Sequence, residues 1–313
     1  LHITPHLGGG VGTVLLNYLS QVNNSRSFKH RVICLDYANQ NAIEVARNVG
    51  FSLFDKISEK KQELLDMIVD SDIVLIHWWN HPLLYDFLVR EELPLCRVII
   101  WSHNSGLYPP GVFTEKLLGY PDLFVFTTPV SYETKEVQNL SEERKKSLRV
   151  VWTTGGVEHV KSVKPKKHNG FNIGYIGIVD YAKMHPDFLN ICNRVDVSDI
   201  KFIVCGGPNE KELKQEAEHL GIGARFNFTG EVPDTKEYLS LFDVFGYPLA
   251  PYHYGTCDQS LQESMAAGVV PVVLANPMES SMVKDGLTGI IAKDKDEYIR
   301  ALQDLYHNHG LRN

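Results

Sequence analysis

Residues 252–273, YHYGTCDQSLQESMAAGVVPVV, combine a predicted helix and a predicted strand around one carboxylate. Across residues 259–267 apolar and polar side chains alternate at helical spacing, and Gly268 supplies a helix stop. The run 269–273 that follows predicts a strand buried on both faces. Glu263 then has two interpretations, a solvated helix residue or a carboxylate that binds a ligand. The rest of the chain decides between them.

Length and charge limit the classes of protein that this chain can belong to. With 313 residues, of which 43% are hydrophobic and 22% charged, it is long enough for two globular domains. The formal net charge is −7, and neither half of the sequence is basic. A protein that binds the phosphate backbone of nucleic acid is therefore not expected.

The cysteines and the hydropathy pattern indicate a soluble, cytoplasmic protein. The five cysteines are widely spaced and odd in number, which favours free thiols, and no cysteine or histidine group has zinc-site spacing. No apolar run approaches the roughly 20 residues that a membrane-spanning helix needs. Because the chain opens on LHITPHLGGG, partway into a predicted strand, we expect that some starting residues are missing.

Short apolar runs alternate with helix-length segments along most of the chain. Predicted strands include RVICLDY, DIVLIHWW, RVIIWSH, LFVFTTP and LRVVWTT in the first half, and NIGYIG, KFIVCGG, RFNFTG, DVFGYPL, VVPVVLA and TGIIA in the second. Predicted amphipathic helices cover residues 11–21, 60–69, 210–220 and 260–267. Such alternation is typical of α/β folds with parallel sheets and right-handed crossovers.

The polar, basic segment EHVKSVKPKKHNG at 158–170 interrupts the alternation. We predict an N-terminal Rossmann-like domain over 1–160, a linker over 161–170 and a C-terminal Rossmann-like domain over 171–313. Ligands of such sheets bind at the carboxyl ends of the strands, so the cleft between two such domains is the expected site. The lysines of the linker suit either a solvated hinge or peripheral contact with anionic lipid.

Several glycine-rich turns follow predicted strands and precede helices. PHLGGGVGT places Gly9, Gly10 and Gly12 at such a turn, and GYIGIVDYAK places Gly177 and Lys183 at another. Backbone amides at a helix start favour anions, and lysine is a point charge suited to a diphosphate. None of these turns matches the dinucleotide fingerprint or the P-loop. Together they indicate a phosphorylated ligand, with tight structural turns as the alternative.

Aromatic and polar side chains gather at two strand ends in the first half. IHWWNHP supplies His77, Trp78 and Trp79, and WSHNSG supplies His103 and Asn104. Aromatic faces beside polar groups suit the mixed surface of a sugar, and burial in the core is the alternative for either tryptophan. No third ligand is placed to make the histidines a metal site, so we predict no metal.

The order of these features resembles the family 4 retaining glycosyltransferases, which have the GT-B fold of two Rossmann-like domains facing each other across a cleft. The likeness runs over nearly the whole chain. It is strongest in NIGYIGIVDYAKMHPDF, in FIVCGGPNEKELKQEAEHLGIGARFNFTGEVP, in the stretch from LFDVFGYPLA to VVPVV, and in MVKDGLTGIIA. In this family the second half binds the nucleotide-sugar donor, and the first half binds most of the acceptor.

The resemblance implies a role for each motif. Glu263 matches the family glutamate that bonds the ribose hydroxyls, and Lys183 matches the lysine that neutralises the donor diphosphate. His103 falls near the histidine that approaches the transferred sugar. The other implied donor-binding residues are Gly9, Gly10, Gly12, Gly177, Gly255, Thr256 and Cys257. The acceptor-side residues are His77, Trp78, Trp79 and Asn104.

Two positions depart from the family pattern. The first of the two family glutamates falls on Gly255, and the arginine that accompanies the lysine falls on Ile178. We expect backbone amides around Gly255, with the side chain of Asp258 or Gln259, to contact the sugar and phosphates instead. His253 and Tyr254 are further candidates.

The resemblance implies transfer of a hexosyl group from a nucleoside-diphosphate sugar (UDP or GDP) to an acceptor hydroxyl, with retention and without a metal or other cofactor. The expected acceptor is a glycan or a lipid-linked glycan, reached in the cytoplasm or at the inner face of the membrane. A sugar-nucleotide epimerase of the same fold is one alternative. A non-catalytic relative that binds the nucleotide sugar is another, because of the two departures.

Overall fold

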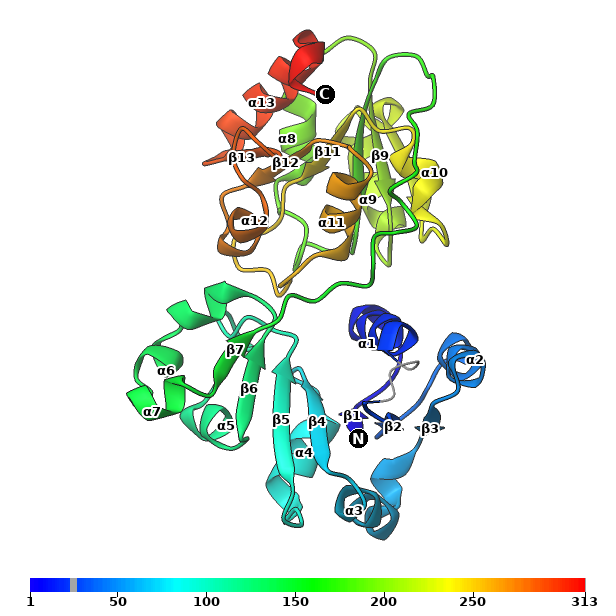
Figure 1. Ribbon diagram of the computed structural model, residues 1–313. Coiled ribbons are helices and arrows are strands. Elements are labelled where there is room, and N and C mark those ends of the chain that lie inside the picture. The colour runs from blue at the N-terminus through cyan, green and yellow to red at the C-terminus, as the bar shows by residue number, and fades with distance from the viewer. Residues whose placement is uncertain (23–26, 313) are drawn as a thin grey trace. The chain divides into compact units, whose positions relative to one another are not determined.

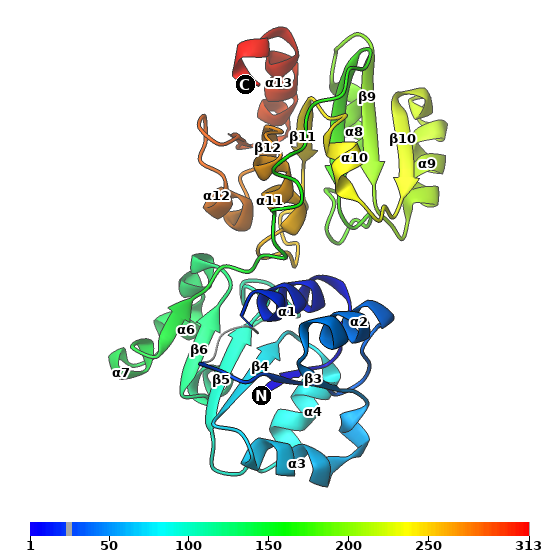
Figure 2. The ribbon, with the colours of Figure 1, turned by 45° about the vertical axis from the view of Figure 1, so that its right-hand side comes forward.

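The computed structural model describes residues 1–22 and 27–312 as two compact units, Leu1–Gly156 (the N-terminal unit) and Val157–Asn313 (the C-terminal unit). Figures 1 and 2 show a sheet flanked by helices in each of them. Every strand pair in both sheets is parallel, as the alternation of strands and helices predicts.

The N-terminal unit contains a seven-stranded sheet in the order β3-β2-β1-β4-β5-β6-β7. Its strands are β1 (His2–Thr4), β2 (Arg31–Cys34), β3 (Ser52–Phe54), β4 (Ile73–Trp78), β5 (Arg97–Ser102), β6 (Leu123–Phe126) and β7 (Leu148–Val150). Its α-helices are α1 (Gly9–Val22), α2 (Gln40–Val49), α3 (Lys61–Val69), α4 (Pro82–Arg90), α5 (Glu115–Gly119), α6 (Lys135–Gln138) and α7 (Glu142–Lys145), with short 3₁₀ turns η1 (Ile57–Glu59) and η2 (Pro129–Glu133).

The C-terminal unit contains a six-stranded sheet in the order β10-β9-β8-β11-β12-β13. Its strands are β8 (Phe171–Ile176), β9 (Ile200–Cys205), β10 (Phe226–Gly230), β11 (Val244–Tyr247), β12 (Pro271–Leu274) and β13 (Ile290–Ala292). Its α-helices are α8 (Phe188–Arg194), α9 (Glu210–His219), α10 (Thr235–Leu239), α11 (Gln259–Ala266), α12 (Pro277–Met282) and α13 (Lys295–His307), with 3₁₀ turns η3 (Gly223–Arg225) and η4 (His309–Leu311).

The predicted strands are confirmed. Burial explains why the central strands appear in the sequence as continuous apolar runs. Every residue of β8, β11 and β12 is buried, as continuous apolar runs between two helix layers require. The unpredicted strand is β3, three partly or fully exposed residues at the edge of the sheet. Helix α11 ends as predicted, because Gly268 adopts a left-handed φ of +76°.

The order of strands defines where each sheet can bind a ligand. In the C-terminal unit the order reverses between β8 and β11, and in the N-terminal unit between β1 and β4. Open α/β sheets bind ligands beside such switch points, at the carboxyl ends of the strands. The predicted residues Gly177 and Lys183 follow β8, whereas Gly9 and Gly12 follow β1.

Candidate functional site

Lys183 is buried at the carboxyl end of β8 and pairs with an acidic residue from another segment. Its Nζ lies 2.6 Å from Oδ1 of Asp258, and the exposed fractions are 8% for each residue. Burial is the largest influence and lowers the pKa of Lys183, but the Asp258 carboxylate together with Tyr247 and Tyr175 outweighs it and holds that pKa well above its usual value. The ammonium is therefore a permanent positive charge at the switch point.

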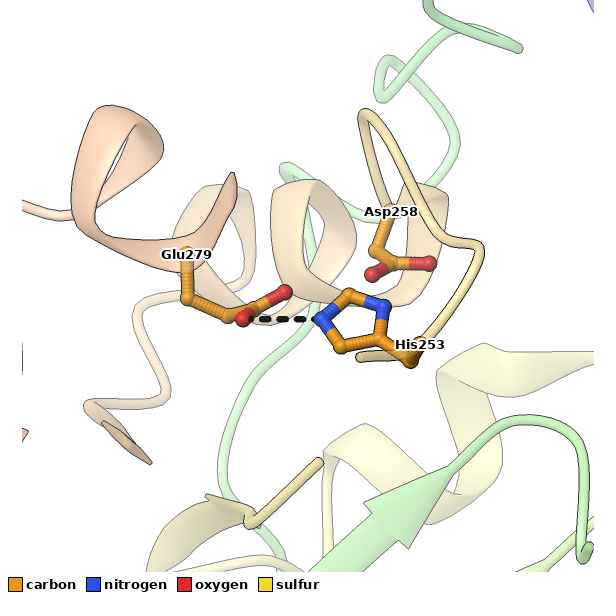
Figure 3. A group of neighbouring side chains, drawn as sticks. All are labelled: His253, Asp258 and Glu279. Carbon is orange, nitrogen blue, oxygen red and sulfur yellow. Dashed lines mark hydrogen bonds and ion pairs between the residues drawn. The ribbon is translucent and has the colours of Figure 1, made fainter. Parts of the chain in front are cut away.

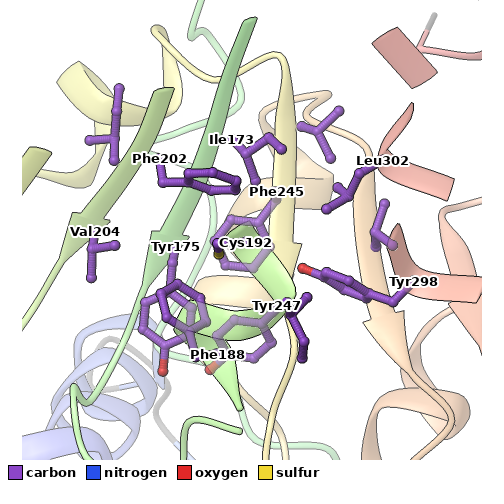
Figure 4. Close-up of a cluster of buried hydrophobic side chains, with 14 of the residues drawn as sticks. Ile173, Tyr175, Phe188, Cys192, Phe202, Val204, Phe245, Tyr247, Tyr298 and Leu302 are labelled. Carbon is purple, nitrogen blue, oxygen red and sulfur yellow. The ribbon is translucent and has the colours of Figure 1, made fainter. Parts of the chain in front are cut away.

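Two buried tyrosines of the core support the loops that carry this pair (Figure 4). The ring of Tyr247 packs against that of Tyr175 at 5.3 Å between centroids, and Lys183 Nζ lies 5.9 Å from the Tyr247 centroid. Their hydroxyls point to the site loops: Tyr175 donates to the carbonyl of Ile178 at 2.8 Å, and Ser260 donates to the Tyr247 hydroxyl at 3.3 Å. The hydrophobic core thus fixes both the loop after β8 and the start of α11.

Glu263 is not a solvated helix residue, so that interpretation is wrong. Only 7% of it is exposed, and both carboxylate oxygens have partners. Oε2 accepts from Thr235 Oγ1 at 2.9 Å, and Oε1 accepts from Gln259 Nε2 at 3.0 Å and lies 3.3 Å from His159 Nε2. These donors fix the orientation of the buried Glu263 carboxylate, as binding of ligand hydroxyls requires.

The loop between β11 and α11 is held by a buried histidine–glutamate pair (Figure 3). His253 Nε2 donates to Glu279 Oε2 at 3.1 Å, and the exposed fractions are 2% and 0%. Because Nε2 is the donor, Nδ1 is free to accept the Gly255 amide at 3.0 Å. Further along, Cys257 Sγ accepts from Gln262 Nε2 at 3.2 Å. No pattern in the sequence pointed to Glu279, which lies on α12.

His253, Asp258 and Glu279 also have the chemistry of metal ligands, with donor atoms within 4.8 Å of one another. Their bonding does not favour a cation. Both ring nitrogens of His253 are engaged, and the Lys183 ammonium balances the charge of Asp258. The arrangement is that of a hydrogen-bonded support for the loop, and the expected absence of a metal requirement stays a prediction.

In the glycine turn of the N-terminal unit, packing explains the glycine at position 12 but not the glycine at position 10. A Cβ on Gly12 would lie 3.1 Å from the carbonyl carbon of Leu7, so α1 passes too close to the turn for a side chain. Gly9 has a left-handed φ of +63°. A Cβ on Gly10 would meet nothing within 4 Å, so its lack of a side chain leaves open space at the first turn of α1. That space suits a ligand at the helix start.

Four histidines form a hydrogen-bonded row across the N-terminal sheet. His30 Nδ1 lies 3.0 Å from His2 Nε2, His2 Nδ1 lies 3.1 Å from His77 Nε2, and His77 Nδ1 lies 3.0 Å from His103 Nε2. The register explains the row. His2 pairs with Leu75 and His77 pairs with Trp101, so His77 and His103 each lie two residues further along and on the same face.

This row keeps its members uncharged. Burial lowers the pKa of His103 to about 3, and burial, followed by the neighbouring histidines, holds the pKa values of His2 and His77 well below their usual value. His103 is therefore a neutral hydrogen-bonding group at working pH. The sequence could not place His2 and His30 beside it, because His2 lies on β1 and His30 directly precedes β2.

Burial corrects two of the expected acceptor-side residues. His77 is fully buried and Trp78 is 4% exposed, so neither has surface to offer an acceptor, and Trp78 is a core residue. Trp79 and Asn104 are partly exposed. Trp79 lies edge-on to His6 at 5.4 Å between centroids, and Asn104 Oδ1 accepts from Ser102 Oγ at 2.8 Å. Direct contact stays a prediction for these two.

The family described as glycosyl transferases group 1 matches residues 157–313, which is the whole of the C-terminal unit and half of the chain. The chain belongs to this family. Its C-terminal unit therefore carries the part that matches the group 1 glycosyltransferases, and glycosyl transfer is its class of reaction. None of the curated proteins matches the sequence.

Solved structures similar to this group 1 glycosyltransferase share its fold over nearly the whole chain. Anabaena Alr3699/HepE in complex with UDP and glucose has a TM-score of 0.74 and 12% identity, covering 99% of this chain and 90% of its own. A glycosyltransferase from Rickettsia africae ESF-5 has a TM-score of 0.76 and 10% identity, covering 99% and 89%. WaaG, a glycosyltransferase involved in lipopolysaccharide biosynthesis, has a TM-score of 0.69 and 13% identity, covering 99% and 91%. The expected GT-B fold is confirmed.

No helix of this group 1 glycosyltransferase is long and apolar enough to cross a membrane, within residues 1–22 and 27–312. The five cysteines are free thiols, as their spacing predicts. The predicted border at residue 160 lies four residues beyond the Gly156–Val157 border of the two units.

Proposed function

We propose that this group 1 glycosyltransferase is a retaining hexosyltransferase. It moves a sugar from a nucleoside-diphosphate sugar, with UDP or GDP as the nucleotide, to a hydroxyl of a glycan or glycoconjugate. The observation that carries the proposal is the buried Lys183 ammonium at the carboxyl end of β8, next to the switch point of the sheet. A fixed positive charge there suits a diphosphate that becomes more negative as it leaves.

Each site residue has a part in this proposal. Glu263 accepts hydrogen bonds from the ribose hydroxyls, and Lys183 neutralises the diphosphate. The backbone at Gly177, Gly255, Thr256 and Cys257 lies against the phosphates and sugar, and the glycines of the α1 turn (Gly9, Gly10 and Gly12) approach the diphosphate. Neutral His103 bonds the transferred sugar, and Trp79 and Asn104 contact the acceptor.

The proposed chemistry needs no enzyme nucleophile and no metal. The bond from the anomeric carbon to the diphosphate breaks while the acceptor oxygen bonds to that carbon on the same face. The acceptor proton passes to a diphosphate oxygen. The protein contributes orientation and the charge of Lys183, which stabilises the leaving group.

We further propose a glycan or lipid-linked acceptor at the cytoplasmic face of a membrane. The exposed lysines at 161, 164, 166 and 167 support contact with anionic lipid. Sedimentation with vesicles of phosphatidylglycerol against phosphatidylcholine tests it. Binding to the anionic vesicles that salt abolishes supports membrane contact, and no binding to either rules it out.

The activity is tested with UDP-glucose, UDP-galactose, UDP-N-acetylglucosamine and GDP-mannose, with and without p-nitrophenyl glycosides as acceptors. Release of nucleotide that depends on the acceptor, with the donor's anomeric configuration in the product by NMR, is the expected result. An altered sugar without acceptor identifies an epimerase, and binding without conversion identifies a non-catalytic relative. The Lys183→Ala variant is the matched control for enzyme-dependent release.

A further inference from the structure

Asp258 has one oxygen engaged and one without a partner. It stands at the N-cap position of α11 but makes no cap hydrogen bond with its side chain. Oδ1 pairs with Lys183, whereas Oδ2 is buried and has no hydrogen-bond partner within residues 1–22 and 27–312. Since the side chain is 92% buried, a carboxylate oxygen without a hydrogen-bond donor is costly to the fold. Such an atom is suited to receive a donor from a ligand.

Gly255 provides the space for this carboxylate. A Cβ at position 255 would lie 2.9 Å from Asp258 Oδ2 and 2.9 Å from His253 Nδ1. Those contacts are too short for carbon, so any side chain would push the carboxylate aside. The glycine that replaces the family glutamate is thus paired with an aspartate whose carboxylate fills the adjoining space.

The surrounding side chains hold the loop without occupying Oδ2. His253 accepts the Gly255 amide on Nδ1 and donates to Glu279 from Nε2 (Figure 3). Gln259, the other candidate for sugar contact, donates to Glu263 instead. Glu279 Oε1 also lacks a partner in the described part of the chain, but no part of that residue is exposed, whereas 8% of Asp258 is.

Charge decides which part of a nucleotide sugar Oδ2 can bind. A carboxylate is repelled by phosphate oxygens, whereas sugar hydroxyls are neutral donors. Asp258 precedes Glu263 by five residues, which is about 7 Å along a helix axis at 1.5 Å per residue. Lys183, which pairs with Asp258, is the residue proposed to bind the diphosphate. If Glu263 binds the ribose and Lys183 the diphosphate, the part of the ligand nearest Asp258 is the sugar attached to the diphosphate.

We propose that Asp258 Oδ2 accepts a hydrogen bond from a hydroxyl of the transferred sugar and makes Asp258 a residue that determines sugar preference. This inference rests on the proposed function, because it takes the ligand to be a nucleotide sugar. Lys183 has two parts in this arrangement: it orients the Asp258 carboxylate through Oδ1, and its positive charge attracts the diphosphate.

The test compares the affinity for a nucleotide sugar with that for its nucleotide alone, by calorimetry in the presence of EDTA. UDP-glucose, UDP-galactose, UDP-N-acetylglucosamine and GDP-mannose are the probes, against UDP and GDP. The Asp258→Asn variant keeps the volume beside Gly255 but removes the charge. Loss of the Asp258 charge also removes the ion pair of Lys183, and this effect changes the affinities for nucleotide and nucleotide sugar by the same factor. The ratio of the two affinities cancels that factor and isolates the sugar contact.

We expect the ratio to fall about tenfold or more in Asp258→Asn, the loss typical of one charge-assisted hydrogen bond. Asp234→Asn, an exposed N-cap carboxylate of α10, is the matched control and leaves the ratio unchanged. An equal shift of both affinities in Asp258→Asn overturns the inference while the nucleotide site stands. Failure of the wild type to bind either nucleotide overturns the proposed function, and the inference with it.

A second variant tests the inference if Asp258→Asn does not fold. Gly255→Ala keeps every charge and displaces Oδ2, so it is expected to lower the same ratio. Melting temperatures of both variants are measured beside the titrations. A Gly255→Ala protein that folds and keeps the wild-type ratio contradicts the role of Oδ2.

Discussion

Lys183 and Asp258 form a buried ion pair, 2.6 Å from Nζ to Oδ1, which keeps a positive charge buried beyond the carboxyl end of β8. The pair joins two segments 75 residues apart, the loop after β8 and the start of α11. It therefore links the stability of the C-terminal unit to the lysine that we propose as the diphosphate-binding group.

The ion pair predicts that stability and activity can be separated by mutation. Lys183→Ala leaves the Asp258 carboxylate buried without a counter-ion, so we expect a loss of about 3–5 kcal/mol in the free energy of unfolding. Transfer activity should fall by about 10²–10³, typical for removing a group that stabilises developing charge. Urea unfolding and initial rates measure the two effects.

The double variant Lys183→Ala/Asp258→Asn is the control for this prediction. Because it removes the unpaired charge, it should recover most of the stability and none of the activity. Recovery of activity would show that the lysine acts only on the fold.

The histidine row predicts a fall in stability with acid. Folding depresses the pKa values of His2, His30, His77 and His103, so below about pH 6.5 the unfolded chain binds protons that the folded chain does not. Stability is therefore complete above pH 6.5 and falls as pH decreases towards the folded pKa, about 3 for His103. Each of His2, His77 and His103 contributes up to about 1.4 kcal/mol per pH unit in that window, and solvent screening makes the contribution of the more exposed His30 smaller.

Urea unfolding of the chain at pH 7.5, 6.0 and 5.0 measures this effect. His77→Phe should flatten the dependence, whereas His219→Phe, at the exposed end of α9, should not. An unfolding free energy of the N-terminal unit that is constant over this range contradicts the account of the row.

The glycine turn of α1 predicts opposite outcomes for neighbouring positions. Gly12→Ala brings a methyl to 3.1 Å from the Leu7 backbone, and we expect a cost of about 1–3 kcal/mol. Gly10→Ala meets nothing and should keep or slightly raise the melting temperature, since alanine favours helix. If the amides of this turn approach the donor, Gly10→Ala lowers the rate without lowering stability; unchanged kinetics would remove Gly10 from the site.

The fold was predictable because its signals are local. Buried parallel strands are continuous apolar runs, and Gly268 ends α11 through its own backbone conformation. The site was less predictable, because the side chains that contact one another there come from different strands and loops. His2 joins His77 across neighbouring strands, and Glu279 reaches His253 from another helix. Neither contact leaves a pattern in spacing.

Residues that are equivalent in the sequence pattern also differ in how deeply the structure buries them. Trp78 and Trp79 are adjacent, but Trp78 is the last residue of β4 and lies in the core, whereas Trp79 follows the end of the strand and is partly exposed. Gly255 read as a lost carboxylate in the sequence, whereas the structure has the carboxylate of Asp258 in the adjoining space. That exchange depends on a loop conformation that no local rule specifies.

The central claim is that the C-terminal unit binds a nucleotide through Glu263, and calorimetric titration of UDP and GDP tests it most directly. We predict that one nucleotide binds the wild type and that Glu263→Gln weakens this binding about tenfold or more, since a carboxylate hydrogen bond contributes about 1.5–3 kcal/mol. The exposed Glu212→Gln of α9 should bind as the wild type does. Binding of neither nucleotide to the wild type, or equal binding by Glu263→Gln, would contradict the account.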